Sequence, residues 1–225
     1  HHSGLNLSYE VLEGLGKHND SQTLPDGTHV RWPSLEGQIA DLADEITYYS
    51  HDLDDGLDAD LVSTADLDTL TIWSDAHVLA EREFGSEFHP HHHRGFLIRC
   101  IVNREVEDLV VTTARAIAES GVRTVNNIRT HPQRLARFSD DTRRGNAALR
   151  KFLYKNLYYN PAVASANARG CGVLEGFFHR LMDDPSLLGR KAASRVASNG
   201  LPRSVADYLA GMTDRYCLEE FAKLN

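Results

Sequence analysis

Asp44, Tyr48 and Asp52 are three side chains that could bind a metal ion and a sugar, and they recur at intervals of four residues. Each step of four residues drifts by only about 40° around a helix, so all three share one face. A carboxylate can bind a hard cation. A sugar can pack on a phenol ring while a second carboxylate accepts a hydrogen bond from one of its hydroxyls. This interpretation requires a cavity beside the face, and spacing alone leaves a solvated acidic face as the alternative.

The helix that must carry these residues is predicted to start at Pro33-Ser34 and to reach about Gly56. Its opposite side repeats apolar residues at helical spacing, namely Ile39, Leu42, Ala43, Ile46, Tyr49 and Leu53. The same periodicity predicts further helices over 8–18, 64–70, 74–84, 96–119, 139–159, 161–182 and 202–212, with a short one after Thr213. Alternating strand patterns are nearly absent. The predicted fold class is therefore all-α, an irregular multi-helix domain.

Length and composition narrow the class of protein. The chain has 225 residues, of which 41% are hydrophobic, enough to form a core, and we expect a single helical domain over residues 1–225. His1-His2-Ser3 is typical of an expression-tag remnant and is left out of the fold prediction. A formal net charge of −8 disfavours binding to duplex nucleic acid. No apolar run approaches the roughly 20 residues that span a membrane. Three widely separated cysteines favour a reducing, cytoplasmic setting.

Two further stretches contain residues that could bind a ligand. The histidine tract at 89–93 resembles a metal-binding tract by composition, but neighbouring side chains cannot all point at one ion, so adventitious surface binding is favoured. The stretch 146–159 carries Arg150, Lys151 and Tyr154 together with Lys155, Tyr158 and Tyr159. It fits a surface that binds phosphate or stacks bases. A packed amphipathic helix with a basic edge is the favoured alternative.

Four stretches in order along the chain carry a family resemblance: 4–18, 33–55, 151–158 and 205–216. The most specific of them contains Asp41-Leu42-Ala43-Asp44-Glu45-Ile46 and His51-Asp52-Leu53-Asp54-Asp55. In these stretches the chain resembles the deoxyguanosine triphosphate triphosphohydrolase family of HD-type phosphohydrolases. The resemblance implies an all-helical fold of that type. It also implies metal-dependent hydrolysis of dGTP or a related deoxynucleoside triphosphate to the deoxynucleoside and inorganic triphosphate.

The resemblance assigns roles to single residues. Asp44 matches the last ligand of a metal site that the family builds from a His, a His-Asp pair and a later Asp, with Mg²⁺ or Mn²⁺ as the expected ion. Asp52 matches the residue that takes the 3′-hydroxyl of the deoxyribose. Tyr48 matches the ring that lies against the 2′ carbon and leaves no room for a ribose hydroxyl. Lys17 is a candidate for contacting the triphosphate. The resemblance also implies a symmetric homo-oligomer, with a hexamer as one form.

One departure limits what this chain is expected to do. The family's first His and its His-Asp pair lie upstream of the matched part, so the chain resembles roughly the C-terminal half of a family member. His51-Asp52 lies on the sugar-facing stripe and does not match that pair. We therefore assign no catalytic residue here and expect this chain alone to be inactive, because a catalytic metal needs about three protein ligands. The alternative is a non-catalytic module that binds a nucleotide or mediates oligomerisation.

Overall fold

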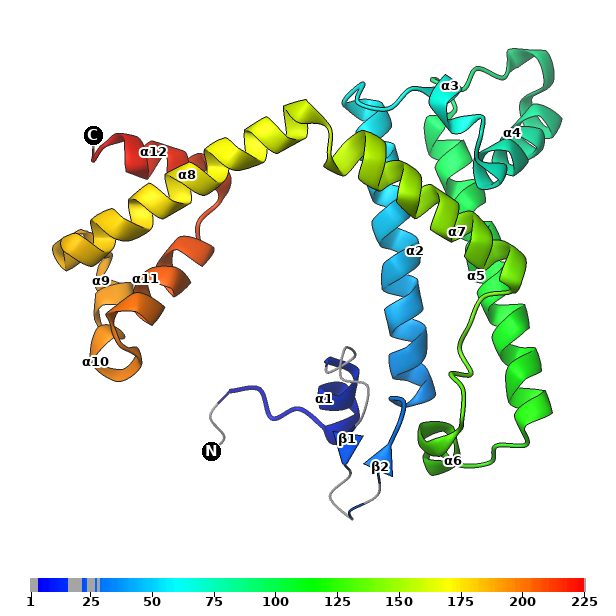
Figure 1. Ribbon diagram of the computed structural model, residues 1–225, viewed down its shortest axis with the longest axis horizontal. Helices are drawn as coiled ribbons and strands as arrows, with labels where there is room; N and C mark the ends of the chain where they lie inside the picture. The colour runs from blue at the N-terminus through cyan, green and yellow to red at the C-terminus, as the bar shows by residue number, and fades with distance from the viewer. Residues whose placement is uncertain (1–3, 16–21, 24–26, 28, 225) are drawn as a thin grey trace. The chain divides into compact units, whose positions relative to one another are not determined.

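A computed structural model describes residues 4–15, 22–23, 27 and 29–224, and it is helical in nearly all its regular structure (Figure 1). Lys17 and the three residues predicted to be a tag remnant lie outside the described residues. The elements are α1 (Tyr9–Leu15), β1 (Gln22–Thr23), β2 (His29–Val30), α2 (Leu35–Asp58), α3 (Thr64–Leu67), α4 (Thr71–Phe84), η1 (Gly85–Glu87), α5 (Arg94–Ser120), α6 (Val125–Thr130), α7 (Asp140–Leu153), the π-helical turn η2 (Tyr154–Tyr158), α8 (Pro161–Asp183), η3 (Pro185–Leu187), α9 (Arg190–Ala193), α10 (Val196–Asn199), α11 (Leu201–Ala210) and α12 (Asp214–Ala222).

The all-α prediction is confirmed. In the described part of the chain the sheet consists of β1 and β2 alone, an antiparallel pair in which Gln22 faces Val30 and Thr23 faces His29. None of the described helices is both long enough and apolar enough to cross a membrane.

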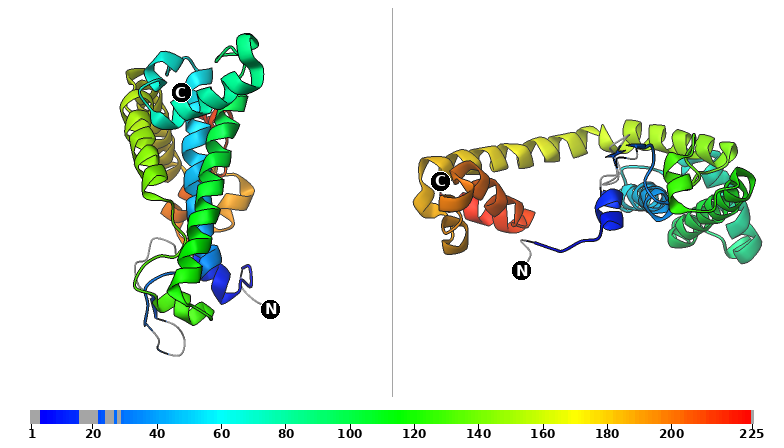
Figure 2. Two further views of the ribbon diagram at one scale, coloured as in Figure 1. Left: turned by 90° about the vertical axis from the view of Figure 1, so that its right-hand side faces the viewer. Right: turned by 90° about the horizontal axis from the view of Figure 1, so that it is seen from below.

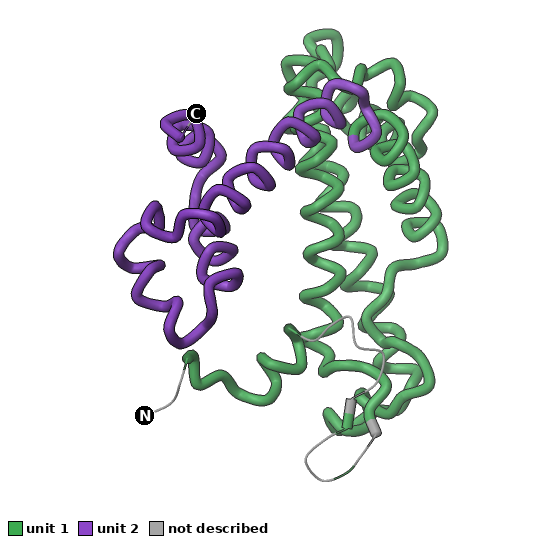
Figure 3. Tube along the Cα trace, turned by 60° about the vertical axis from the view of Figure 1, so that its left-hand side comes forward, with its two compact units in different colours: residues 1–157 green, residues 158–225 purple. Residues whose placement is uncertain are grey.

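Contacts within the chain gather into two compact units, residues 1–157 and 158–225 (Figure 3). The boundary falls inside η2, at a point where no glycine or polar linker interrupts the sequence. The sequence therefore carries no composition shift that would reveal it. Whether the two units fold together as the one expected domain stays a prediction.

The long helix α2 forms where the sequence predicts it, and it organises the first unit. Ser34 caps its N-terminus by accepting a hydrogen bond from the Gly37 amide at 3.3 Å. Ile46 and Leu53 are buried on its apolar side, and α2 runs beside α5 (Figure 2). Ile39 was expected on the same side but is 39% exposed. The buried side of the first turns is instead polar, for the reason given below.

A buried ion pair fixes the place where α2 begins. Glu13, on α1, accepts from Arg129, on α6, through two contacts: Nε to Oε1 at 2.8 Å and Nη2 to Oε2 at 2.9 Å. The same carboxylate accepts from the Ser34 amide at 3.1 Å. The Arg129 carbonyl in turn accepts from the amides of Arg31 and Trp32 at 2.9 and 3.2 Å. Glu13 and Arg129 are only 2% and 7% exposed, so each buried charge is stabilised by the opposite charge of its partner.

Gln38, one turn into α2, is completely buried and makes the next polar link. Its Nε2 donates to the Pro33 carbonyl at 3.0 Å, and its Oε1 accepts from the amides of Leu135 and Ala136 at 3.0 and 3.2 Å. The side chain therefore ties the segment before α7 to α2. A polar residue occupies the buried side of α2 here because backbone groups of another segment need partners.

The second unit has its own apolar core, built by α8, α9, α11, α12 and the segment between them. Its buried side chains are Phe177, Leu181, Leu188, Ala192, Val205, Leu209 and Cys217. The predicted helix over 161–182 is confirmed as α8, which Asn160 caps by accepting from the Ala162 amide at 2.9 Å.

Substituting Glu13 by Ala should destabilise the chain by about 3 to 5 kcal/mol, because it leaves the Arg129 guanidinium buried without its partner. Urea unfolding followed by circular dichroism measures this loss. Asp141→Ala is the matched control, since it removes a carboxylate that pairs with Arg144 on an exposed surface. An equal loss in both variants would show that burial adds nothing to the Glu13–Arg129 pair.

Candidate functional site

Helix α2 carries Asp44, Tyr48 and Asp52 on one side, away from its apolar side. Asp44 is exposed, Tyr48 is 53% exposed, and Asp52 is half-buried. The Tyr48 ring meets the edge of the Tyr49 ring, with centroids 5.3 Å apart. The helix therefore brings the three residues to one face, as their spacing predicts, and their roles in binding stay predictions.

The described residues do not by themselves form a metal site at Asp44. Among the described residues, no three or more His, Cys, Asp or Glu side chains are placed to hold an ion together. Asp44 can thus supply at most one of the roughly three ligands that a catalytic metal needs. The histidine tract is also no such cluster: the rings of His91 and His92 lie 5.9 Å apart at the surface. Lys17, the candidate for the triphosphate, lies outside the described residues.

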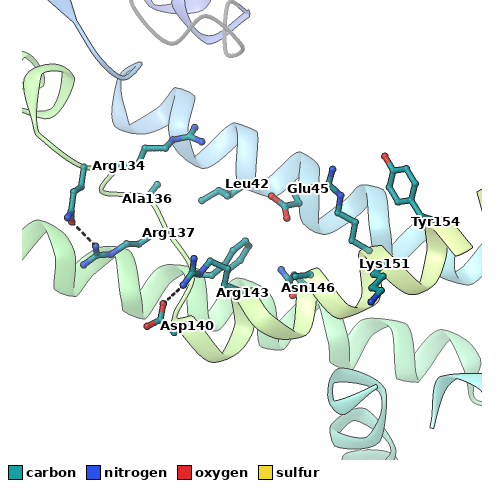
Figure 4. Close-up of a pocket in the computed structure, with 14 residues that line it drawn as sticks. Leu42, Glu45, Arg134, Ala136, Arg137, Asp140, Arg143, Asn146, Lys151 and Tyr154 are labelled. Atoms are coloured by element: carbon teal, nitrogen blue, oxygen red, sulfur yellow. Dashed lines mark hydrogen bonds and ion pairs between the residues drawn. The ribbon is translucent and has the colours of Figure 1, made fainter. Parts of the chain in front are cut away.

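The described part of the chain does form a cavity of about 930 Å³, on another flank of α2, and Asp44, Tyr48 and Asp52 do not line it. One wall is α2, the second is α7, and the segment before α7 closes the end (Figure 4). The lining residues are Leu42, Glu45, Gln133, Arg134, Ala136, Arg137, Phe138, Asp140, Arg143, Asn146, Ala147, Arg150, Lys151 and Tyr154.

Hydrogen bonds from two other helices hold the segment before α7 in place. Gln38 of α2 accepts from two of its amides, as described above. From α5, the Thr113 hydroxyl accepts from the Arg137 amide at 3.2 Å, and the Asp108 carboxylate accepts from the Ser139 amide at 2.8 Å. Ser139 then caps α7. The end wall of the cavity is thus fixed through its backbone, which leaves its arginine side chains available for contacts.

The cavity lining is cationic although the chain as a whole has a net charge of −8. Five of its side chains are Arg or Lys and two are carboxylates. Arg143 pairs with Asp140 at 2.8 Å, and Arg134 pairs with Asp41 at 2.8 Å. Arg134 also lies over the Trp32 ring, 5.8 Å from its centroid.

Three of the five cations form no ion pair with any described carboxylate: Arg137, Arg150 and Lys151. Arg150 lies over the Tyr154 ring, 5.7 Å from the ring centroid. Arg137 makes one long hydrogen bond to Gln133, at 3.4 Å. The positive charge of the cavity is therefore only partly neutralised by the chain itself.

Two buried polar groups lie in the lining or directly behind it. Asn146, on α7, is 4% exposed; its Oδ1 has no hydrogen-bond partner among the described residues, and its amide acts on the carboxylate of Glu105. Next to it, Glu105 of α5 is 2% exposed, and its Oε2 also lacks a partner there. Burial raises the pKa of Glu105 to about 7, and the nearby Asn146 amide offsets part of that rise. Burial also raises the pKa of Glu45, against the lowering effect of Arg150.

Sequence reasoning found part of this cavity and missed the rest. It singled out Arg150, Lys151 and Tyr154 as a candidate phosphate surface, and all three line the cavity. It missed Arg134 and Arg137, which come from an irregular segment whose position depends on Gln38. The position of Arg143 could have been predicted from the sequence. It shares one helical face with Ala147, Arg150 and Tyr154, at steps of four, three and four residues.

Comparison with known proteins shows what the chain is similar to. A family model described as a phosphohydrolase-associated domain matches residues 136–223. Proteins named deoxyguanosinetriphosphate triphosphohydrolase-like match nearly all of the chain. The relative from Ralstonia pickettii is 35% identical over 98% of this chain and 58% of its own length. The values are 33%, 99% and 59% for Geobacter metallireducens, and 37%, 98% and 56% for Deinococcus deserti. The chain thus spans less than two thirds of the length of these relatives.

Replacing Glu105 by Gln should remove a pH dependence from the stability of the chain. The pKa of Glu105 is raised from its ordinary value near 4.5 to about 7, so between these values the folded chain keeps a proton that the unfolded chain releases. The free energy of unfolding therefore falls as pH rises through this window, by about 3 kcal/mol in all. The Gln side chain carries no such proton.

Urea unfolding of the wild type and Glu105→Gln at pH 4, 6 and 8 measures the difference. We expect the largest relative gain for the variant at pH 8 and the smallest at pH 4. Parallel curves for the two proteins across this range would contradict the assignment.

Proposed function

We propose that this chain, which is similar over nearly its whole length to deoxyguanosinetriphosphate triphosphohydrolase-like proteins, forms part of a deoxynucleoside triphosphate triphosphohydrolase. The proposed reaction converts dGTP or a related deoxynucleoside triphosphate to the deoxynucleoside and inorganic triphosphate. The observation that carries the proposal is the stripe on α2. A carboxylate, a phenol and a second carboxylate lie one turn apart on a side of the helix that the apolar core does not use.

Tyr48 and Asp52 are proposed to hold the sugar. The ring of Tyr48 is half exposed and can take the apolar side of a deoxyribose. Asp52 lies about two helical turns after Asp44 on the same face, and it can accept a hydrogen bond from the 3′-hydroxyl. A ring packed against the 2′ carbon excludes a hydroxyl there, so discrimination against ribonucleotides would be steric.

Asp44 is proposed as a metal ligand of the whole protein, with Mg²⁺ or Mn²⁺ as the ion. The described residues of this chain do not complete such a site, so the remaining ligands must come from elsewhere. The His and His-Asp pair that the family resemblance implies are the candidates. We propose no step of the reaction for the residues of this chain. That the whole protein forms a homo-oligomer is also a proposal.

A second candidate function is a module that binds a nucleotide or mediates oligomerisation without catalysis. It is favoured by the same observation on the metal ligands, because one carboxylate does not hold a catalytic ion. Turnover assays of the longest natural gene product with a panel of deoxynucleoside triphosphates and either Mg²⁺ or Mn²⁺ separate the two functions. Release of inorganic triphosphate supports the enzyme, and binding without turnover supports the module.

Asp44→Ala in the intact protein should abolish turnover and reduce the bound metal, because the variant lacks a ligand carboxylate. Metal content by mass spectrometry and triphosphate release measure the two effects. Glu36→Gln is the matched control, since Glu36 is an exposed carboxylate in the first turn of α2, two turns before Asp44. Normal turnover by Asp44→Ala would refute the role of this residue.

Asp52→Ala should chiefly raise KM and weaken the preference for deoxyribose over ribose, by roughly tenfold for a lost hydrogen bond from a sugar hydroxyl to a charged group. Steady-state kinetics with dGTP and GTP measure both effects. A variant that loses kcat while KM and sugar preference stay unchanged would place Asp52 outside the sugar site.

A further inference from the structure

We propose that the outward apolar side of α1, together with the segment before it, is the surface on which a further segment of the same protein docks, one that this chain lacks and its relatives carry. The residues of this α1 surface are Leu5, Leu7, Val11, Leu12 and Leu15. The inference does not rest on the proposed function, because none of its observations concerns a substrate or a reaction.

Burial along α1 is the reverse of what a helix at the surface of a globular protein shows. Such a helix turns its apolar residues to the core and its charged residues to solvent. In α1 the buried side chain is the carboxylate of Glu13, which is 2% exposed. The apolar side chains of Val11, Leu12 and Leu15 are 49%, 54% and 69% exposed. The helix therefore presents to solvent the residues that a helix normally buries.

The segment before α1 adds to the same surface. Leu5 is 83% exposed and Leu7 is 37% exposed, so the exposed large apolar side chains lie close together in the sequence. Single exposed leucines are ordinary on protein surfaces, but several in one short segment indicate a contact surface.

Polar and backbone contacts hold α1 beside the start of α2, so its apolar side is not needed for anchoring (Figure 1). Glu13 pairs with Arg129, and the Arg129 guanidinium lies over the Tyr9 ring, 5.4 Å from the ring centroid. Val11 and Leu15 lie about 160° around the helix from Glu13. The contacts of Glu13 therefore fix the direction in which these apolar side chains point, which is outward.

The length of the relatives identifies the occupant of the α1 surface. This chain matches 58%, 59% and 56% of the three relatives described above, so about two fifths of each has no counterpart here. In those proteins both parts belong to one chain, and a contact between them forms at any concentration. A second copy of this chain would cover the surface only above its dissociation constant. A helix as short as α1 is marginal by itself, which favours a cover that is always present.

Hydrogen–deuterium exchange of this chain and of the longest natural gene product, read by mass spectrometry, tests the proposal. The amides of residues 9–15 should exchange roughly tenfold more slowly in the longer protein, because a covered helix opens less often. In this chain their exchange should not depend on protein concentration. Equal exchange in the two proteins would overturn the proposal. A natural gene product no longer than this chain would also overturn it, because the docking segment would then not exist.

The double variant Leu12→Lys/Leu15→Lys places two charges on the α1 surface. In this chain it should leave the midpoint of urea unfolding nearly unchanged, because both side chains are already more than half exposed. In the longer protein it should speed the exchange of residues 9–15 by roughly tenfold, towards the rate in this chain. Leu218→Lys is the matched control, since Leu218 on α12 is 53% exposed, and it should change that exchange by less than about twofold.

Two further outcomes would count against this occupant. Exchange of residues 9–15 that slows as the concentration of this chain rises would assign the α1 surface to a second copy. Slow exchange that persists in the longer protein with both lysines present would show that the apolar side of α1 is not part of the contact. Circular dichroism checks that the variants are folded. Because no readout uses turnover, the result is independent of the proposed reaction.

Discussion

The carboxylate of Glu13 is the group on which the placement of α2 depends. It accepts two hydrogen bonds from Arg129 and one from the amide of Ser34, and Ser34 caps α2. Three segments that are far apart in sequence thus meet at one buried negative charge. Any chemistry on α2 inherits its position from this contact, because a helix that starts elsewhere would turn its faces to other partners.

Helix α2 presents three different sides to three different environments. Its apolar side packs in the core with Ile46 and Leu53. A second side carries the stripe of Asp44, Tyr48 and Asp52. The flank with Leu42 and Glu45 forms one wall of the cationic cavity. Since all these residues belong to one rigid helix, the spacing between the stripe and the cavity is set by helical geometry, which suits precise placement of ligands better than a loop does.

The sequence was sufficient to predict what depends on local pattern. The all-α class and the long helix that starts at Pro33-Ser34 follow from periodicity and from rules for helix starts. The family resemblance, based on four ordered stretches, is confirmed by relatives that cover 98% of the chain or more. What could not be predicted depends on distant partners. Gln38 bonds to residues 97 and 98 positions away, so nothing near it in the sequence shows why a polar side chain is buried there.

Helix α2 carries many carboxylates, and arginines from other segments pair with several of them. Like charges on one helix face weaken the helix, and carboxylates in its last turn oppose the helix dipole. Arg94, at the start of α5, reduces both the repulsion and the unfavourable dipole interaction, because it pairs with Asp54 at 2.7 Å and with Asp58 at 2.8 Å. Arg134 pairs with Asp41, nearer the N-terminus of α2, and reduces the repulsion between like charges there. Packing and these pairs together keep α2 helical while its stripe stays acidic.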